Sequence, residues 1–223
     1  MNGQTLHEFV DVILVAVATL LPIVNPLGGA PIYLAMTTGL PDADRPRMAY
    51  RVAIHSFVLL LASILIGAYV LDFFGVSIPA VQVAGGLVVC SFAWSLLNGQ
   101  ATPAVSGRSG ADGADALTQR AFYPLTMPLT VGPGSMSVAV TLGANSAGNL
   151  RGLLITSIAH TIGVLIVALA IYLSYRYAQP MLRRLGSAGS NVFMRLSAFI
   201  LLAIGTQIVW NGVRGLLTTL RFS

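Results

Sequence analysis

Six long stretches without a charged side chain set the strongest constraint on how this chain folds. They occupy most of its 223 residues and are 18 to 35 residues long. A helix needs about 20 apolar residues to cross a hydrocarbon core of about 30 Å. Each stretch can therefore hold one span, and none is long enough for two. The stretches are 12–41, 52–71, 73–107, 121–150, 152–175 and 196–213.

The composition places these stretches in a membrane. Only 9% of the residues are charged, compared with roughly 25% in soluble proteins. Inside lipid every backbone amide needs an internal partner, and outer-membrane strands would be only about 10 residues long with alternating polarity. We therefore predict an all-α membrane protein with six transmembrane helices that lies in a lipid bilayer. The predicted spans are 9–38, 50–72, 77–98, 121–143, 152–175 and 193–215.

The arginines predict an orientation in the membrane. All twelve basic side chains are arginines, and nine of them lie in the connections after the first, third and fifth predicted spans. An excess of arginine marks the cytoplasmic side. We therefore predict a multi-pass protein of the bacterial inner membrane with both termini in the periplasm. In a soluble protein the net charge of +5 would suggest nucleic acid; here membrane orientation explains the arginines, and we expect no nucleic-acid partner.

The chain divides into two halves that look alike. A segment rich in Gly and Ser separates a first three-helix repeat, 1–100, from a second, 121–223, and we interpret 101–120 as a flexible cytoplasmic linker. Similar proline motifs recur 107 residues apart, at Pro26 and Pro133. Three spans is an odd number, so the second half must be inverted relative to the first. This predicts the inverted-repeat plan of many secondary transporters.

Prolines and glycines predict that the first and fourth helices are broken at mid-membrane. Two prolines and two glycines fall within Pro22–Gly29, and a richer cluster falls within Pro124–Gly134. Proline removes an amide donor and clashes with the preceding turn. Broken backbone at membrane depth is tolerated only inside protein or beside a water-filled cavity. Two breaks in corresponding positions indicate a transport site, although kinked structural helices would carry the same residues.

We predict one substrate pocket between the two breaks. Helix ends that restart after a break suit a carboxylate, and the carbonyls left free suit an ammonium group or a cation. A small zwitterionic amino acid fits both. Leucine at Gly28 or Gly134 is expected to fill the pocket while the protein stays folded. Asn25 can contact the substrate, cap the second half-helix, or do both. The predicted substrate contacts are Asn25, Pro26, Gly28, Thr130, Gly132, Pro133, Gly134, Ser135 and Gln207.

Other polar residues suggest little further chemistry. His160 is a candidate for coupling transport to protons, although a packed structural histidine is the alternative, and sodium is a second coupling ion to consider. Cys90 is the single cysteine, which argues against a membrane enzyme such as a thiol-electron carrier, because that carrier needs paired cysteines. We see no nucleophile set, metal-ligand cluster or phosphate loop, and expect no enzyme activity, metal or cofactor.

Two segments resemble a known family. The runs Leu21–Ala30 and Tyr123–Gly134 resemble the two signature segments of the MarC family, and the resemblance extends over essentially the whole chain. It implies a carrier or exporter of small solutes, with small neutral amino acids as expected substrates. A structural or regulatory membrane subunit without transport activity is the alternative. The direction of transport and the formation of a homo-oligomer are left open.

Overall fold

The computed structural model describes residues 3–37, 40–98, 121–144 and 150–220, and nearly all of these residues lie in helices. The predicted linker, 101–120, lies outside the described residues, so the division of the chain at that linker stays a prediction. The helices are α1 Gly3–Val24, α2 Pro26–Met36, α3 Arg45–Phe73, α4 Ile78–Leu97, the π-helix η1 Ala121–Thr130, α6 Pro133–Ala144, α7 Leu150–Arg176 and α8 Ala178–Leu220.

The long helices agree with a membrane protein. Within the described residues, five helical segments are long and apolar enough to cross a bilayer, and each overlaps one of the predicted spans. The remaining predicted span, 121–143, consists of η1 and α6, which are separated by Val131 and Gly132. The protein is therefore an all-helical membrane protein with five to six long apolar helices. The five segments are His7–Met36, Arg45–Phe73, Ile78–Leu97, Gly152–Arg176 and Ala188–Thr218.

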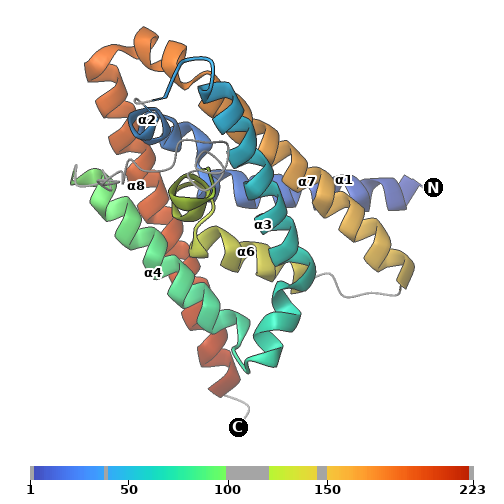
Figure 1. Ribbon diagram of the computed structural model, residues 1–223. Coiled ribbons are helices and arrows are strands. Elements are labelled where there is room, and N and C mark those ends of the chain that lie inside the picture. Colours follow the sequence, from blue (N-terminus) through green and yellow to red (C-terminus); the bar gives the residue numbers. More distant parts are fainter. Residues whose placement is uncertain (1–2, 38–39, 99–120, 145–149, 221–223) are drawn as a thin grey trace.

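Helices α4 and α8 lie side by side and run in opposite directions (Figure 1). Small residues allow this close approach: a Cβ added at Gly86 would lie 2.9 Å from the carbonyl oxygen of Gly205. Such backbone contacts are typical of helix pairs in membranes. Helix α8 also turns sharply at Gly186, whose φ of 66° is a conformation that favours glycine. The predicted sixth span therefore lies within the part of α8 that follows this turn.

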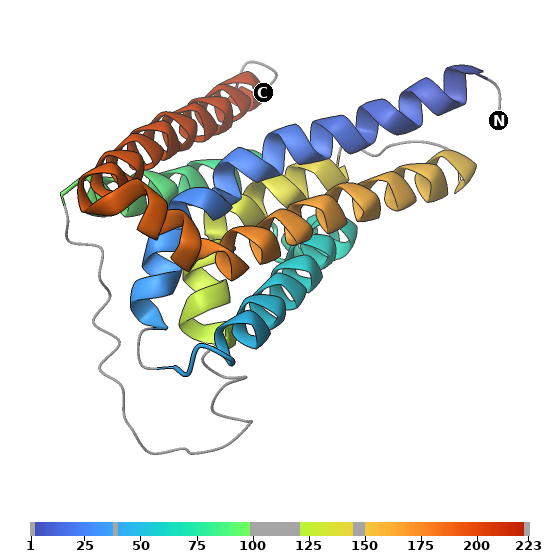
Figure 2. The same cartoon turned by 90° about the horizontal axis from the view of Figure 1, so that it is seen from above.

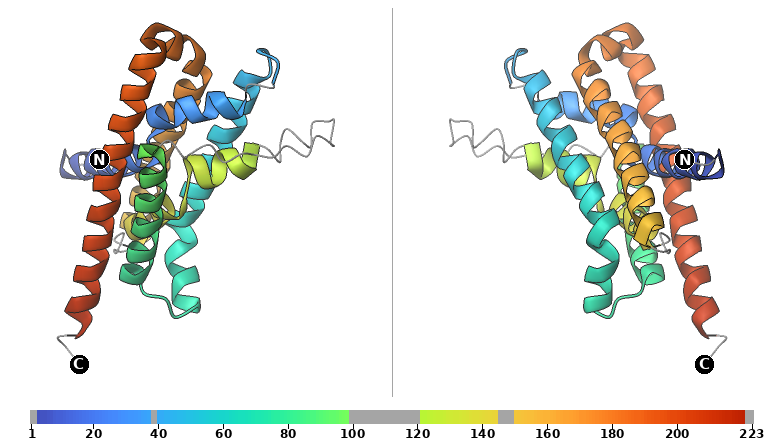
Figure 3. Two further views of the ribbon diagram at one scale, coloured as in Figure 1. Left: turned by 90° about the vertical axis from the view of Figure 1, so that its left-hand side faces the viewer. Right: turned by 90° about the vertical axis from the view of Figure 1, so that its right-hand side faces the viewer.

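The other helices complete the bundle around α6. Helix α3 contacts α6, η1 and α7, and α1 packs along α7 (Figure 2). Figure 3 shows α1 nearly end-on while α8 runs the length of the view, so these two helices cross at a large angle. The uncharged runs predicted that both segments are helices, but they carried no information about this crossing.

Apolar side chains cover both the inside and the outside of the bundle. The larger core cluster joins residues of α1, α2, α3, η1, α6, α7 and α8, and a smaller one joins α2, α4 and α8. Large apolar side chains such as Leu65, Ile66 and Leu165 are exposed on the outer surfaces of the long helices. Helices that are apolar on every side are typical of membrane spans, so these outer surfaces are suited to contact lipid.

Candidate functional site

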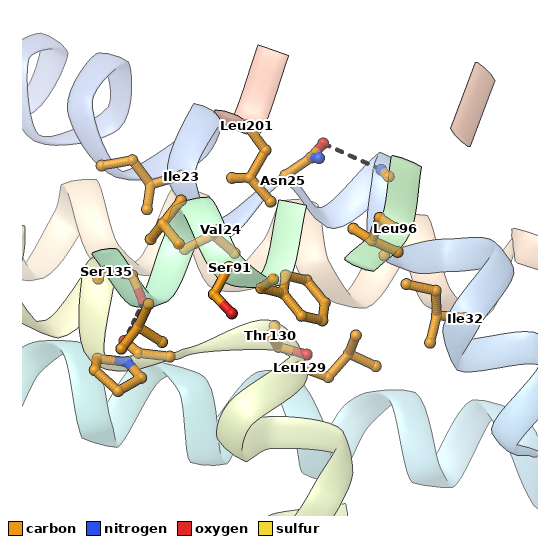
Figure 4. A pocket seen from close by; sticks show the side chains of 18 of the residues that line it. Ile23, Val24, Asn25, Ile32, Ser91, Leu96, Leu129, Thr130, Ser135 and Leu201 are labelled. Carbon is orange, nitrogen blue, oxygen red and sulfur yellow. Dashed lines mark hydrogen bonds between the residues drawn. The ribbon is translucent and has the colours of Figure 1, made fainter. Parts of the chain in front are cut away.

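The first junction is Asn25, the single residue between α1 and α2. A residue that precedes proline is disfavoured in the right-handed helical region, and Asn25 instead takes the left-handed conformation, with φ 45° and ψ 57°. Asparagine tolerates this conformation better than most residues. Its side-chain Oδ1 accepts a hydrogen bond from the Gly28 amide at 3.2 Å (Figure 4). Asn25 therefore caps α2, which begins with Pro26 at its first position.

The second junction is Val131–Gly132, between η1 and α6, and prolines shape the helix that leads into it. Tyr123 and Met127 each precede a proline and have extended backbones, with φ of −121° and −115°. This is the same steric rule that acts on Asn25. Prolines also lack the amide hydrogen of a regular helix. A wider turn results, in which the Val131 amide donates to the Thr126 carbonyl, five residues earlier, at 2.8 Å.

A tyrosine of α7 holds the second junction in place. The Thr130 hydroxyl donates to the Leu125 carbonyl at 2.7 Å and lies 2.8 Å from the Tyr175 hydroxyl. Because the Thr130 hydroxyl donates its hydrogen to the Leu125 carbonyl, the Tyr175 hydroxyl is the donor in the bond between the two hydroxyls. The Tyr175 ring stacks on Tyr33 of α2, with centroids 4.5 Å apart. A Cβ at Gly29 would lie 2.8 Å from the Tyr175 hydroxyl, so this one side chain contacts both α2 and η1.

The two junctions line one cavity of about 360 Å³. Its walls come from the end of α1, the start of α2, the middle of α4, the end of η1, the start of α6 and one residue of α8. Figure 4 shows Asn25, Ser91, Thr130 and Ser135 around this cavity. The lining residues are Ile23, Val24, Asn25, Gly28, Gly29, Ile32, Val88, Val89, Ser91, Phe92, Ser95, Leu96, Leu129, Thr130, Gly132, Pro133, Gly134, Ser135 and Leu201. We call it the junction cavity.

Most of the residues predicted to contact substrate line the junction cavity, and three predicted residues lie elsewhere. Pro26 is buried at the start of α2 and is not among the lining residues. Gln207 lines a second cavity, further along α8. His160, the predicted coupling residue, is buried on α7 and lines neither cavity. The predicted residues that line the junction cavity are Asn25, Gly28, Thr130, Gly132, Pro133, Gly134 and Ser135.

The helix ends at the junction cavity favour an anionic group. None of its lining residues carries a charge, but the amide ends of α2 and α6 both border it. Helix N-termini carry a partial positive charge. Three carbonyls beside the junctions already accept hydrogen bonds: Leu21 accepts from the Asn25 amide at 2.9 Å, and Leu125 and Thr126 accept from Thr130 and Val131.

Comparison with known proteins places the chain in a family. Residues 10–217 match the family described as MarC family integral membrane protein. The chain belongs to the MarC family. A UPF0056 membrane protein of Methanocaldococcus jannaschii is 30% identical over 205 residues, covering 92% of this chain and 97% of the relative. The UPF0056 inner membrane protein MarC of Salmonella typhimurium is 29% identical over 206 residues, covering 90% and 93%. No solved structure matches.

The glycines of this MarC family protein have a structural role that the sequence did not predict. A Cβ at Gly134 would meet the Val89 side chain and lie 3.0 Å from the carbonyl oxygen of Gly85. A Cβ at Gly28 would meet the amide group of Asn25 and displace the cap. The contacts at Gly134 contradict the expectation that leucine fills the pocket there without disturbing the fold, whereas the same expectation for Gly28 stays a prediction, because a side chain there meets only the Asn25 side chain. Leucine at Gly134 would instead separate α6 from α4.

Several residues of the junction cavity were not selected from the sequence. Ser91 and Ser95 stand four residues apart on α4 and both line the cavity. Their spacing puts them on one helix face, but membrane hydroxyls commonly bond their own backbone, as Ser95 does to the Phe92 carbonyl at 2.7 Å. Tyr175 had no signal in the sequence, because it lies at the end of an ordinary apolar run. Only the packing of α7 brings it to Thr130.

Within the described residues, no group of three or more His, Cys, Asp or Glu side chains could hold a metal ion. The hydroxyls near the second junction are bonded to backbone carbonyls: Ser135 donates to Gly132 at 2.9 Å and Ser137 to Gly134 at 2.8 Å. These bonds leave the hydroxyl oxygens able to accept from a ligand. The junction cavity can therefore bind a small polar solute without forming a covalent bond to it.

Proposed function

We propose that this MarC family protein is a secondary transporter of small solutes and that it binds them in the junction cavity. The observation that carries the proposal is that two junctions far apart in the sequence, Asn25 and Val131–Gly132, border the same cavity. We interpret them as the mid-membrane breaks of the first and fourth helices. Non-helical backbone at membrane depth costs free energy unless it lines a cavity or is buried in protein, and transporters use it to bind their substrates.

The inverted repeat is part of this proposal. We pair α1–α2 with η1–α6, α3 with α7, and α4 with α8. If each element is replaced by its partner in the other half, most contacts in one half correspond to contacts in the other. The contact of α1 with α7 corresponds to that of η1 with α3, and the contact of α2 with α7 corresponds to that of α6 with α3. The contact of α2 with α8 corresponds to that of α6 with α4. The partner helices α3 and α7 contact each other, as do α4 and α8, so these two contacts are unchanged by the replacement. A packing pattern largely preserved by this exchange supports two related halves of the kind found in many secondary transporters. Within the described residues, the contacts of α8 with α1 and with α7 have no comparable counterparts between η1 and α4 or between α3 and α4.

Small neutral amino acids are the substrates we propose. A volume of about 360 Å³ lies at the lower end of the range for ligand pockets, about 300–1,000 Å³. The amide ends of α2 and α6 suit a carboxylate, while the Asn25 amide and the Ser91 hydroxyl offer hydrogen bonds. Apolar side chains such as Ile32 and Leu129 suit a small aliphatic group.

Transport into proteoliposomes tests the proposal. Purified protein would be reconstituted, and uptake of labelled glycine and alanine measured under proton, sodium and substrate gradients. We expect uptake that saturates with substrate concentration and that exceeds uptake into protein-free liposomes. Absence of solute movement under every gradient and with a wider amino-acid panel would favour the alternative, a structural or regulatory membrane subunit.

Coupling and orientation are separate parts of the proposal. If His160 couples transport to protons, the change His160→Gln abolishes the proton dependence of uptake; unchanged dependence would remove it from the mechanism. We also propose that the protein lies in an inner membrane, as the name of the Salmonella relative states for that protein. Reporter fusions at Ser223 and near Ser109 test whether both termini are periplasmic, and cytoplasmic reporter activity at Ser223 would contradict it.

A further inference from the structure

A second cavity, of about 400 Å³, lies between α1, α4, α6 and α8. Side-chain amides and hydroxyls alternate with apolar residues around it, and none of its lining residues is charged. We call it the amide cavity. Its lining residues are Ala18, Thr19, Pro22, Ile23, Gln82, Val138, Thr141, Leu142, Ile204, Gln207, Ile208 and Asn211.

The amide cavity keeps hydrogen-bonding capacity for a ligand. Gln82 donates from Nε2 to the Thr141 hydroxyl at 3.0 Å, and Gln207 donates from Nε2 to Oδ1 of Asn211 at 2.9 Å. Each amide offers two N–H donors and an acceptor oxygen, so these bonds use only part of what the three side chains can form. Amides are costly in a membrane unless paired, and they usually face a cavity or another helix. The chemistry fits a small polar solute without net charge.

The two cavities lie in series along the same helices. On α4 the junction cavity is lined by residues from Val88 to Leu96, and the amide cavity is lined by Gln82. On α8 the junction cavity is lined by Leu201, and the amide cavity by residues from Ile204 to Asn211. At 1.5 Å per residue the centres of the two sets of lining residues are about 10–15 Å apart along the helix axes, a third to a half of the thickness of a hydrocarbon core of about 30 Å. The lining residues of α1 and α6 follow the same order.

Ile23 is the residue that lines both cavities. Between the two sets of lining residues α4 and α6 are in close contact, because a Cβ at Gly85 would lie 2.7 Å from the Ser137 hydroxyl and 3.0 Å from the Pro133 carbonyl oxygen. This contact leaves little room between the two helices. The half-buried side chain of Ile23 is therefore the part of the wall between the cavities that can move without separating helices.

We propose that the amide cavity is a second solute-binding site on one route through the protein, and that Ile23 closes this route between the two sites. The proposal rests on the transport function proposed above and adds where the solute goes on leaving the junction cavity. The ligand class is a small polar solute without net charge, which includes zwitterionic amino acids. Each cavity is then open to a different face of the membrane while Ile23 stays in place.

Cysteine labelling tests the route without measuring transport. Cys90 lines neither cavity, so Cys90→Ala provides a cysteine-free background for Ser91→Cys in the junction cavity and Thr19→Cys in the amide cavity. A membrane-impermeant thiol reagent would be added to right-side-out and to inside-out vesicles. We expect the two cysteines to react from opposite faces, and we expect glycine or alanine to slow labelling at both. Labelling of both from one face, or no labelling at Thr19→Cys, would overturn the proposal.

The change Ile23→Ala tests the closure. It should make each cysteine reactive from both faces, whereas Ile204→Ala, which removes a similar volume from the amide cavity alone, should leave the sidedness unchanged. Since Ile23 also packs against the core, Ile23→Val serves as a milder variant with an intermediate loss of sidedness. Unchanged sidedness in both Ile23 variants would refute closure by this residue.

Transport measurements separate the two proposals. In proteoliposomes, Gln207→Leu should reduce glycine uptake severalfold while Ser91→Cys in the junction cavity still reacts from its own face. If the unmodified protein moves no solute but the labelling pattern holds, the proposed transport fails and the route between the cavities stands. If the unmodified protein transports glycine and the labelling pattern fails, transport stands and the inference is overturned.

Discussion

The two junctions are built in different ways. The first depends on one residue and its neighbours in sequence: Asn25 turns the chain, and its side chain caps the Gly28 amide. The second depends on a residue from another helix, because the Thr130 hydroxyl accepts a hydrogen bond from Tyr175 of α7. A junction built from local contacts keeps its shape wherever the surrounding helices lie. The second junction can respond to a movement of α7, which makes it the better candidate for a part that changes during transport.

The largest expected effect comes from Tyr175→Ala. This change removes a fully buried ring that stacks on Tyr33 and bonds Thr130, and loss of a buried aromatic ring costs about 3–5 kcal/mol. We expect thermal unfolding in detergent at a much lower temperature and loss of glycine uptake. Tyr177→Ala is a matched control, since Tyr177 is exposed. An unchanged melting temperature would show that the second junction does not depend on α7.

Tyr175→Phe and Thr130→Val sharpen this result. The first removes only the tyrosine hydroxyl, so we expect a loss of about 1 kcal/mol. The second also leaves the Leu125 carbonyl and the Tyr175 hydroxyl without their partner, which costs about 1–3 kcal/mol. The double variant should be no less stable than Thr130→Val alone, since both changes remove the same bond. Additive losses of stability would mean that the two hydroxyls act independently.

Changes at Asn25 should have a smaller effect and separate its two roles. Asn25→Ala removes the cap and strains the left-handed backbone, with an expected loss of about 2 kcal/mol of stability. Asn25→Gly relieves the strain, and its stability should fall by only a few tenths of a kcal/mol. Asn25→Asp keeps the capping oxygen. If both Asn25→Gly and Asn25→Asp retain stability but lose glycine uptake, the amide contacts the substrate; if uptake survives in both, Asn25 is only a cap.

The smallest expected effect is that of Ser91→Ala. Ser91 is exposed and lines the junction cavity, so its loss should leave the melting temperature unchanged. If its hydroxyl bonds the substrate, the apparent affinity for glycine should fall by up to about tenfold, the equivalent of about 1.4 kcal/mol. Ser63→Ala is the control, because that hydroxyl bonds the Leu59 carbonyl and lines neither cavity. Equal affinity in both variants would place the substrate away from α4.

Local chemistry explains why much of the site could be predicted from the sequence. Prolines act on the residue before them, so Asn25, Tyr123 and Met127 leave the helical region for a reason that is visible in a short segment. The predicted contacts at both junctions therefore lie close to the observed cavity. The prediction was wrong about leucine at Gly134, because the Val89 side chain and the Gly85 carbonyl that crowd this glycine depend on how α4 and α6 pack.

The sequence by itself determined where the apolar helices lie and where the chain is interrupted between them. Run length and charge decide whether a segment can enter a membrane, and proline and asparagine decide where a helix ends. The tertiary structure alone decided that Tyr175 reaches Thr130, that α4 supplies Ser91, and that Gln207 belongs to a second cavity. These contacts join helices distant in the chain, and their geometry depends on how whole helix surfaces pack against one another.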